Sequence, residues 1–190
     1  MSARVPIGIS ARHVHLCQAD LEKLFGPGYT LTPTKPLSQP GQFACAETVE
    51  VHGPKGSFPK VRILGPVRRR TQIEIARSDA FVLGLDPPVR DSGELDGTPG
   101  VRLVGPAGEV ELAQGVIVAQ RHLHLQTAEA EQLGLKDKDL IRVRIDGVRA
   151  LIFENVLVRV GPQYAMDLHL DTDEANAAGA KNGDLATILQ

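Results

Sequence analysis

The sequence is poor in cysteine, in aromatic residues and in long apolar runs. Its 190 residues include two cysteines, five phenylalanines, two tyrosines and no tryptophan. The two cysteines form no Cys-x-x-Cys pair, which argues against a disulfide framework. There is no run of 18 apolar residues, so we expect no membrane-spanning helix. A formal net charge of −2 argues against broad electrostatic binding to nucleic acid.

Glycine and proline are abundant by contrast, with 19 and 13 residues. Together with a hydrophobic fraction of 42%, they predict many short strands and turns around an aliphatic core. We therefore expect a mainly β fold of small barrels with short helices, rather than a helical bundle. Residues 18–25, 78–85, 127–133 and 172–178 are predicted to be helical. Residues 148–153 and 156–160 are predicted as two separate strands.

Four of the six histidines lie in two copies of the motif Arg-His-x-His-Leu. The first copy contains His13 and His15, and the second contains His122 and His124. On a β-strand, residues i and i+2 point to the same face, about 6.6 Å apart. The two imidazoles of a copy can then bind one metal ion, and imidazole suits zinc, copper, iron and nickel. The alternative is the polar face of an amphipathic strand, which the repetition of the whole motif disfavours.

An internal repeat supplies a third ligand for each histidine pair. Residues 71–80 align with residues 166–175, which places Glu74 over His169 before a predicted helix in each half. A catalytic zinc ion commonly takes three protein ligands. Glu74 also has an alternative role in pairing with an arginine, and Cys17 stays open as an extra ligand or weak nucleophile. The two predicted metal sites are therefore formed by His13, His15 and Glu74, and by His122, His124 and His169.

These motifs resemble those of the PduL-type phosphate acyltransferases, and the resemblance extends over residues 5–189. It is carried by VPIGISARHVHL at 5–16, VRILGP at 61–66, QIE at 72–74, QRHLHL at 120–125 and MDLH at 166–169. It implies reversible exchange of acyl-CoA plus phosphate for acyl phosphate plus CoA, with a short acyl chain such as propanoyl or acetyl. It also implies two similar small β-barrels with a two-zinc active site between them.

The resemblance further implies domain boundaries and residue roles. The first β-barrel would span residues 12–119, and the second residues 120–190 together with the N-terminal strand 1–11. The six ligands predicted above match the zinc positions of the family. Arg68 matches the phosphate-binding arginine, and Ser92 lies where the active-site loop approaches the phosphate. The CoA contacts carry over to Gly8, Ile9, Ser10, Lys55, Arg62, Leu64 and Asn176, with Lys35 as the other candidate for the lysine.

The expected partners are CoA or acyl-CoA, phosphate and a second copy of the chain, without nucleic acid or membrane. The catalytic region implied by the resemblance starts by residue 5, which leaves no room for the N-terminal extension that directs many family members into bacterial microcompartments. A cytoplasmic enzyme is therefore expected, with packaging by another partner left open. Two alternative functions remain: a zinc hydrolase of a thioester or phosphoester, and a non-enzymatic, metal-stabilised binding module.

Overall fold

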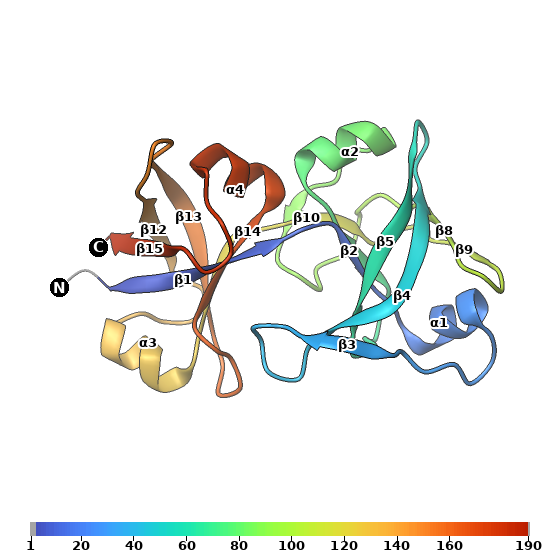
Figure 1. Cartoon of the computed structure of the whole chain (residues 1–190), viewed down its shortest axis with the longest axis horizontal. Helices are drawn as coiled ribbons and strands as arrows, with labels where there is room; N and C mark the ends of the chain where they lie inside the picture. Colours follow the sequence, from blue (N-terminus) through green and yellow to red (C-terminus); the bar gives the residue numbers. More distant parts are fainter. Residues whose placement is uncertain (1–2, 190) are drawn as a thin grey trace. The chain divides into compact units, whose positions relative to one another are not determined.

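A computed structural model describes residues 3–189 of the chain (Figure 1). The described residues form two compact units. The barrel unit comprises residues 3–11, 38–40 and 120–189, and the sheet unit comprises residues 12–37 and 41–119. Strands predominate in both units, so the mainly β fold class is confirmed. None of the helices in this part of the chain is long and apolar enough to cross a membrane.

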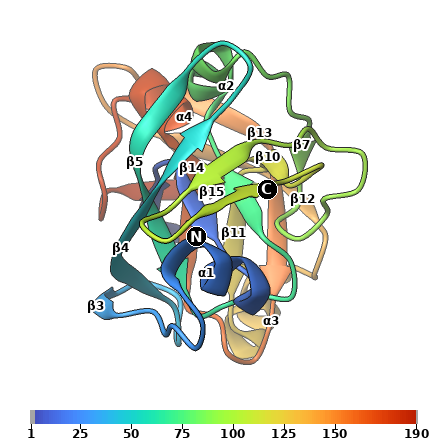
Figure 2. The same ribbon diagram turned by 90° about the vertical axis from the view of Figure 1, so that its right-hand side faces the viewer.

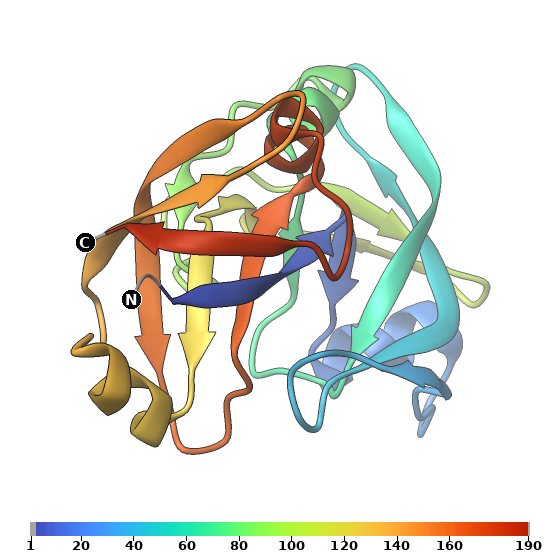
Figure 3. The ribbon, with the colours of Figure 1, turned by 60° about the vertical axis from the view of Figure 1, so that its left-hand side comes forward.

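The barrel unit is a closed six-stranded barrel in the order β1-β14-β11-β13-β12-β15. Figure 3 brings β1 forward between its two neighbours; it pairs in parallel with β14 and antiparallel with β15. This pairing joins an early strand to two late ones and closes the barrel. The strands are β1 (Arg4–Ser10), β11 (His122–Leu125), β12 (Leu140–Ile145), β13 (Leu151–Val160), β14 (Asp167–Asp171) and β15 (Leu185–Leu189).

Alternation along the strands gives this barrel its core. Leu123 and Leu125 on β11 are buried, as are Leu168 and Leu170 on β14, and all four belong to one apolar cluster. Because side chains alternate between the two faces of a strand, the intervening residues point away from that cluster. Helices α3 (Thr127–Leu133) and α4 (Thr172–Ala178) directly follow these two strands. Their bounds agree with the sequence prediction.

Strand β13 corrects one sequence expectation. The predicted break between residues 153 and 156 is wrong, because a single strand runs from Leu151 to Val160. On the partner strand β12, Ile141 pairs with Val156 and Val143 pairs with Phe153. Two residues of β13 therefore face one residue of β12, which is a β-bulge. Asn155 lies in the bulge with φ of 56°, and asparagine tolerates this left-handed conformation better than most residues.

The sheet unit contains a curled, nine-stranded sheet that does not close, with β7 and β9 at its ends (Figure 2). Its order is β7-β10-β6-β2-β5-β4-β8-β9, and β3 pairs with β4. Its helices are α1 (Gln18–Phe25), as predicted, and α2 (Arg77–Leu83), which begins one residue and ends two residues before the predicted range 78–85. Its strands are β2 (His13–His15), β3 (Pro33–Pro36), β4 (Phe43–His52), β5 (Ser57–Gly65), β6 (Gln72–Glu74), β7 (Val89–Arg90), β8 (Arg102–Val104), β9 (Glu109–Glu111) and β10 (Val116–Ala119).

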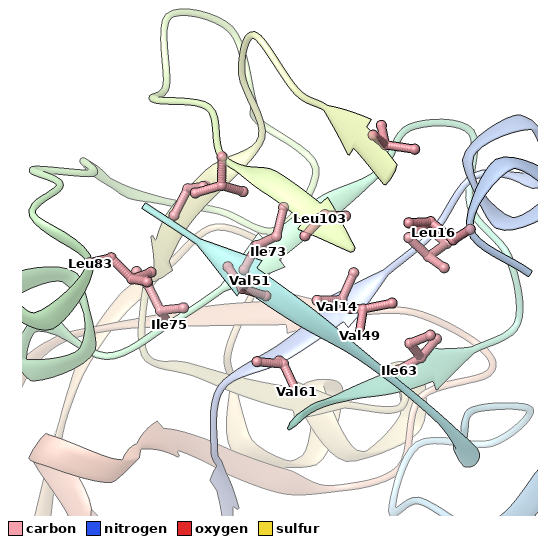
Figure 4. Close-up of a cluster of buried hydrophobic side chains, with 14 of the residues drawn as sticks. Val14, Leu16, Val49, Val51, Val61, Ile63, Ile73, Ile75, Leu83 and Leu103 are labelled. Atoms are coloured by element: carbon pink, nitrogen blue, oxygen red, sulfur yellow. The ribbon is translucent and has the colours of Figure 1, made fainter. Parts of the chain in front are cut away.

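One face of this sheet carries a buried aliphatic core. Figure 4 shows Val14, Ile63 and Ile73 in this core, on the neighbouring strands β2, β5 and β6. Val14 pairs with Ile63 on one side and with Ile73 on the other. Residues that pair directly across strands share a face of the sheet. The residues on either side of each of these three therefore point to the opposite face, where the candidate site lies.

Candidate metal centres

The first predicted ligand set comes together on the face opposite the sheet-unit core. β2 and β6 are antiparallel, and their register places Glu74 opposite His13. His13 Nε2 lies 3.6 Å from Glu74 Oε2, and the His13 and His15 ring centroids are 4.9 Å apart. One ligand atom from each of the three residues lies within 4.8 Å of the others. All three side chains are buried.

Burial and neighbouring charge set the protonation of this set. Burial lowers the pKa of His15 to about 3, with further lowering by the charges of His13 and Arg68. Burial by itself raises the pKa of Glu74, but the nearby His13 and His15 lower it more, to a final value of about 2. At neutral pH the set therefore offers a neutral His15 and an ionised Glu74, which are the forms that bind a metal ion.

A chain of hydrogen bonds connects Glu74 to Arg68. The Arg68 guanidinium donates to Ser92 Oγ over 3.0 Å, and Ser92 Oγ donates to Glu74 Oε1 over 2.8 Å. Gln72 Nε2 donates to the same Glu74 oxygen, and Gln72 Oε1 accepts from the Gly93 backbone N–H over 2.8 Å. The predicted catalytic residues Arg68 and Ser92 are thus joined to the first ligand set, although their roles stay predictions.

The second predicted ligand set lies on the barrel wall, on the opposite side of β11 and β14 from the apolar cluster. The antiparallel register of these strands places His169 opposite His122. His122 Nε2 and His124 Nε2 are 3.0 Å apart, and the His169 ring centroid lies 5.0 Å and 4.9 Å from those of His122 and His124. These three residues also offer ligand atoms within 4.8 Å of one another.

The surroundings of His124 lower its pKa. Burial, followed by the charges of His122 and His169, lowers the pKa of His124 to about 2. Its ring packs edge-on against Tyr164, with centroids 4.5 Å apart. Its Nδ1 is a buried side-chain nitrogen without a hydrogen-bond partner in the described chain. Three converging imidazoles, with the Nε2 atoms of His122 and His124 3.0 Å apart, are a donor set suited to a divalent metal ion.

The arginine that begins each motif anchors the strand to a helix rather than entering the ligand set. The Arg12 guanidinium donates to Asp79 on α2 over 2.6 Å and lies 4.2 Å from the centroid of the Phe58 ring. Arg121 in the barrel unit likewise donates to Glu174 on α4 over 2.7 Å. Both carboxylates also accept the backbone N–H of their helix N-cap residue. The repeated arginine thus has a structural explanation.

Two polar residues beside the ligands were missed in the sequence analysis. Gln72 lies two residues before Glu74, and Asp167 lies two residues before His169. Asp167 Oδ2 is 3.0 Å from His169 Nε2, and Asp167 is 4% exposed. The signal that could have identified them was present, because the repeat aligns Gln72 with Asp167. The alignment was used for the third ligands alone.

The predicted CoA contacts fall into both units. In the barrel unit, Gly8, Ile9 and Ser10 lie on β1, and Asn176 lies on α4. Gly8 pairs with His169 across the parallel strands β1 and β14. In the sheet unit, Arg62 pairs with His13, and the carbonyl oxygen of Leu64 lies 3.2 Å from His15 Nδ1.

The two lysine candidates lie at different places in the sheet unit. Lys55 follows β4 at the turn before β5, and its backbone N–H donates to Leu83 O at the end of α2 over 3.0 Å. Lys35 on β3 pairs with Ala44, and Ala44 pairs with Leu64. Register therefore places Lys35 in the same row as Leu64, two strands away across the sheet. The Leu64 carbonyl oxygen is the atom that contacts His15.

Cys17 does not belong to either ligand set in the described structure. Its Sγ donates to Asp20 Oδ2 over 3.3 Å, and its backbone N–H donates to Thr71 Oγ1 over 3.0 Å. Thr71 also donates to the same Asp20 oxygen over 2.6 Å. These contacts account for Cys17 as a residue at the start of α1.

Comparison with known proteins gives consistent results over nearly the whole chain. Residues 6–181 match the family model of phosphate propanoyltransferase. A phosphate propanoyltransferase of Thermotoga maritima is 55% identical over 185 residues, which cover 97% of this chain and 88% of the relative. The phosphate propanoyltransferase of Salmonella typhimurium is 51% identical, covering 94% and 85%. That of Rhodopseudomonas palustris is 49% identical, covering 98% and 83%.

Proposed function

Because the chain belongs to the phosphate propanoyltransferase family, we propose that it transfers a short acyl group, propanoyl or acetyl, reversibly between CoA and phosphate. The observation that carries this proposal is the hydrogen-bonded chain from Arg68 through Ser92 to Glu74. It joins an anion-binding side chain to a buried set of metal-ligand types. Acyl transfer to phosphate needs both an anion site and a means of polarising a thioester.

The proposal includes two zinc ions per chain, one in each ligand set. Two histidines with a glutamate, and three histidines, are donor sets typical of catalytic zinc. The buried, unpartnered Nδ1 of His124 and the 3.0 Å contact between two Nε2 atoms support this fit. Zinc, when bound, supplies a Lewis acid that polarises a carbonyl or phosphoryl oxygen.

The residues around Glu74 would bind and orient the phosphate. A guanidinium matches phosphate with two parallel hydrogen bonds, so Arg68 would hold the nucleophile and balance its charge. Ser92 donates to Glu74 and accepts from Arg68, which fixes the position of both. The phosphate oxygen would then attack the thioester carbonyl, forming a C–O bond as the C–S bond breaks and CoA leaves as the thiolate.

Direct attack is favoured over a covalent acyl-enzyme. A nucleophilic serine is normally activated by a hydrogen-bonded histidine. In the described chain Ser92 Oγ instead contacts Arg68, Gln72 and Glu74. The Ser92 hydroxyl donates its hydrogen bond to Glu74, which is itself a ligand candidate. Ser92 is therefore better suited to positioning than to attack.

The finer contacts and the setting belong to the same proposal. CoA would contact Gly8, Ile9, Ser10, Arg62, Leu64 and Asn176, with a lysine, Lys55 or Lys35, at its phosphates. We also propose a homodimer in the cytoplasm; light scattering during gel filtration would give a mass near twice the 20.4 kDa of one chain. A mass of one chain would contradict the dimer.

The experiment that tests the proposed function follows thiol release and acyl phosphate together. Purified chain of known zinc content is mixed with propanoyl-CoA or acetyl-CoA, with and without phosphate. We expect thiol release to require phosphate and acyl phosphate to form in equal amount. Thiol release that is independent of phosphate, with free acid as product, would instead identify a zinc hydrolase. CoA binding without turnover would identify a binding module.

A further inference from the structure

In each unit, a polar residue lies two positions before the third ligand on the same strand. Its side chain can form a hydrogen bond with that ligand. In the sheet unit the ligand is a carboxylate, Glu74, and Gln72 two residues earlier donates an amide N–H to it. In the barrel unit the ligand is an imidazole, His169, and Asp167 two residues earlier offers a carboxylate to its Nε2 at 3.0 Å. A donor thus faces the acceptor ligand, and an acceptor faces the donor ligand.

From this pairing we infer that Asp167 is a positioning residue that holds His169 in the tautomer with Nε2 protonated and Nδ1 presented to the metal ion. The inference rests on the proposal that His122, His124 and His169 hold a zinc ion. A histidine that binds a metal usually donates its other ring N–H to a carboxylate or carbonyl, which fixes the tautomer and the ring orientation. An ionised carboxylate accepts that N–H more strongly than a neutral group does.

Two other ligand candidates, one in each unit, have a backbone carbonyl as the partner of one ring nitrogen. His122 Nδ1 lies 2.7 Å from the Gln120 carbonyl oxygen, and His15 Nδ1 lies 3.2 Å from the Leu64 carbonyl oxygen. A carbonyl oxygen can only accept, so in both rings Nδ1 is the donor and Nε2 is the nitrogen that would bind the metal ion. In His169 the two ring nitrogens have the opposite roles, because the carboxylate partner lies at Nε2 and Nδ1 is left for the metal ion. Ser38 Oγ also approaches this nitrogen, at 3.4 Å, but it is farther away and uncharged.

The backbone around Asp167 is built to accept the carboxylate. Gly8 lies on the adjacent strand β1, in register with His169. A Cβ atom on Gly8 would lie 2.6 Å from Asp167 Oδ2 and 3.1 Å from His169 Cδ2. Only glycine leaves the space that the carboxylate and the ring occupy. Asp167 itself is 4% exposed and does not belong to the cluster of ligand atoms, which fits a supporting role rather than a fourth ligand.

The test measures zinc affinity and the tautomer of His169 rather than turnover. In a His13→Ala, His15→Ala background, only the barrel-unit set remains for zinc. Competition with a chromophoric chelator then gives the affinity with and without Asp167→Asn. We expect Asp167→Asn to weaken zinc binding by about 10- to 100-fold, as substitutions of such partners commonly do. Gly8→Ala, which displaces the carboxylate without removing it, should weaken zinc binding in the same direction.

The matched control is Asp146→Asn, the same chemical change at a half-exposed carboxylate that pairs with Arg144 in the barrel unit. Its zinc affinity should equal that of the background. Circular dichroism of every variant separates a local effect from a loss of fold. If Asp167→Asn fails to fold, Gly8→Ala and the spectrum of the unsubstituted chain still decide the question.

Nitrogen-15 NMR of histidine in the zinc-loaded, unsubstituted chain reads the tautomer directly. We expect His169 to show a protonated Nε2 and a zinc-bound Nδ1, while His122 shows a zinc-bound Nε2. A zinc-bound Nε2 on His169, or unchanged affinity in both variants, would overturn the assignment of Asp167. If the background chain binds no zinc at all, the barrel-unit metal site of the proposed function is itself wrong.

Discussion

The residue that most directly connects the proposed chemistry to the structure is Arg68. Its neighbours Arg69 and Arg70 belong to the same run of three arginines, yet the structure gives them different surroundings. Arg68 contacts Ser92, which contacts a ligand candidate, whereas Arg70 forms an exposed ion pair with Asp96 over 2.9 Å. Arginines that are close in sequence therefore make different contacts.

Arg68→Ala should raise the KM for phosphate by at least tenfold, because a charge-assisted contact with an anion is lost. The KM for acyl-CoA should change much less. Steady-state kinetics with each substrate varied in turn would measure both values. Arg69→Ala, the same change at an exposed neighbour, is the control and should leave the phosphate KM near that of the unsubstituted chain. Equal phosphate KM values for both variants would exclude the phosphate role of Arg68.

A second residue, Glu47, makes stability depend on pH. Glu47 accepts hydrogen bonds from the Tyr29 hydroxyl and the Thr32 backbone N–H, both over 3.0 Å. Burial raises the pKa of this carboxyl, but the hydrogen bonds lower the pKa by a larger amount. The net shift of the pKa is therefore downward. A carboxyl with a lower pKa in the folded state stabilises the fold above its unfolded pKa, near 4.3. That contribution is lost as the pH falls.

Glu47→Gln should therefore lower the free energy of unfolding at pH 7 by about 1–2 kcal/mol, because hydrogen bonds to a charged group are worth about 1.5–3 kcal/mol and the neutral Gln side chain still accepts. The difference from the unsubstituted chain should shrink below about pH 4, where the carboxyl is protonated in the unfolded state. Urea unfolding at several pH values would measure it, with the exposed Glu111→Gln as control. A difference that is constant from pH 3 to 7 would contradict this account.

At the scale of elements, strand register decides which distant residues surround each ligand. Four strands of the sheet unit bring Lys35, Ala44, Leu64 and His15 into one row. Lys35 on β3 pairs with Ala44 on β4, and Ala44 pairs with Leu64 on β5. The Leu64 carbonyl oxygen in turn contacts His15 on β2. Lys55 belongs to the opposite end of the β4–β5 pair, beside α2. Register therefore favours Lys35 over Lys55 as the lysine of the proposed CoA site.

Lys35→Ala should raise the KM for acyl-CoA several-fold, with little effect on kcat, because an exposed lysine that meets a CoA phosphate contributes to binding alone. Lys55→Ala serves as its matched control and should change the acyl-CoA KM less. Initial rates at saturating phosphate would compare the two. The reverse order, with the larger KM increase in Lys55→Ala, would restore the position first predicted from the sequence.

At the scale of the whole molecule, each unit has its own apolar cluster and its own ligand set. No ligand set combines residues of both units among the described residues. Binding of one ion therefore does not need ligands from the other unit. The consequence is that the two proposed zinc sites can be removed one at a time.

The His13→Ala and His122→Ala variants should each retain about one zinc ion per chain, and the double variant should retain none. The reason is that a site with three ligands loses most of its affinity for the metal ion when one ligand is removed. Elemental analysis after dialysis would give the stoichiometry. His52→Ala is the control, since His52 contacts Glu50 at 2.8 Å and belongs to neither set. Loss of both ions from a single substitution would show that the sites depend on each other.

Removal of zinc by a chelator should abolish acyl transfer, and added zinc should restore it. The fold of each unit should persist, because its aliphatic core does not include the ligands. Far-ultraviolet circular dichroism of the metal-free chain would check this. Collapse of the spectrum on chelation would assign the metal ions a structural role instead.

The sequence by itself determined the features that depend on neighbours along the chain. The i, i+2 spacing of each histidine pair, the aliphatic residue between them and the repeat that aligns Glu74 with His169 are all local patterns. They indicated both ligand sets, which the structure brings together. Helices α1, α3 and α4 were likewise predicted with their observed bounds. For α3 and α4 the signal was a glycine that ends the helix in the left-handed conformation.

Only the tertiary structure decided which residues support those ligands and how the strands are paired. Asp167 and Gln72 became recognisable through their contacts with His169 and Glu74, and register with Leu64 distinguished Lys35 from Lys55. One sheet closes into a barrel while the other stays open, and β13 continues through the bulge at Asn155. Strand register joins residues far apart in the chain, so no local pattern specifies it completely.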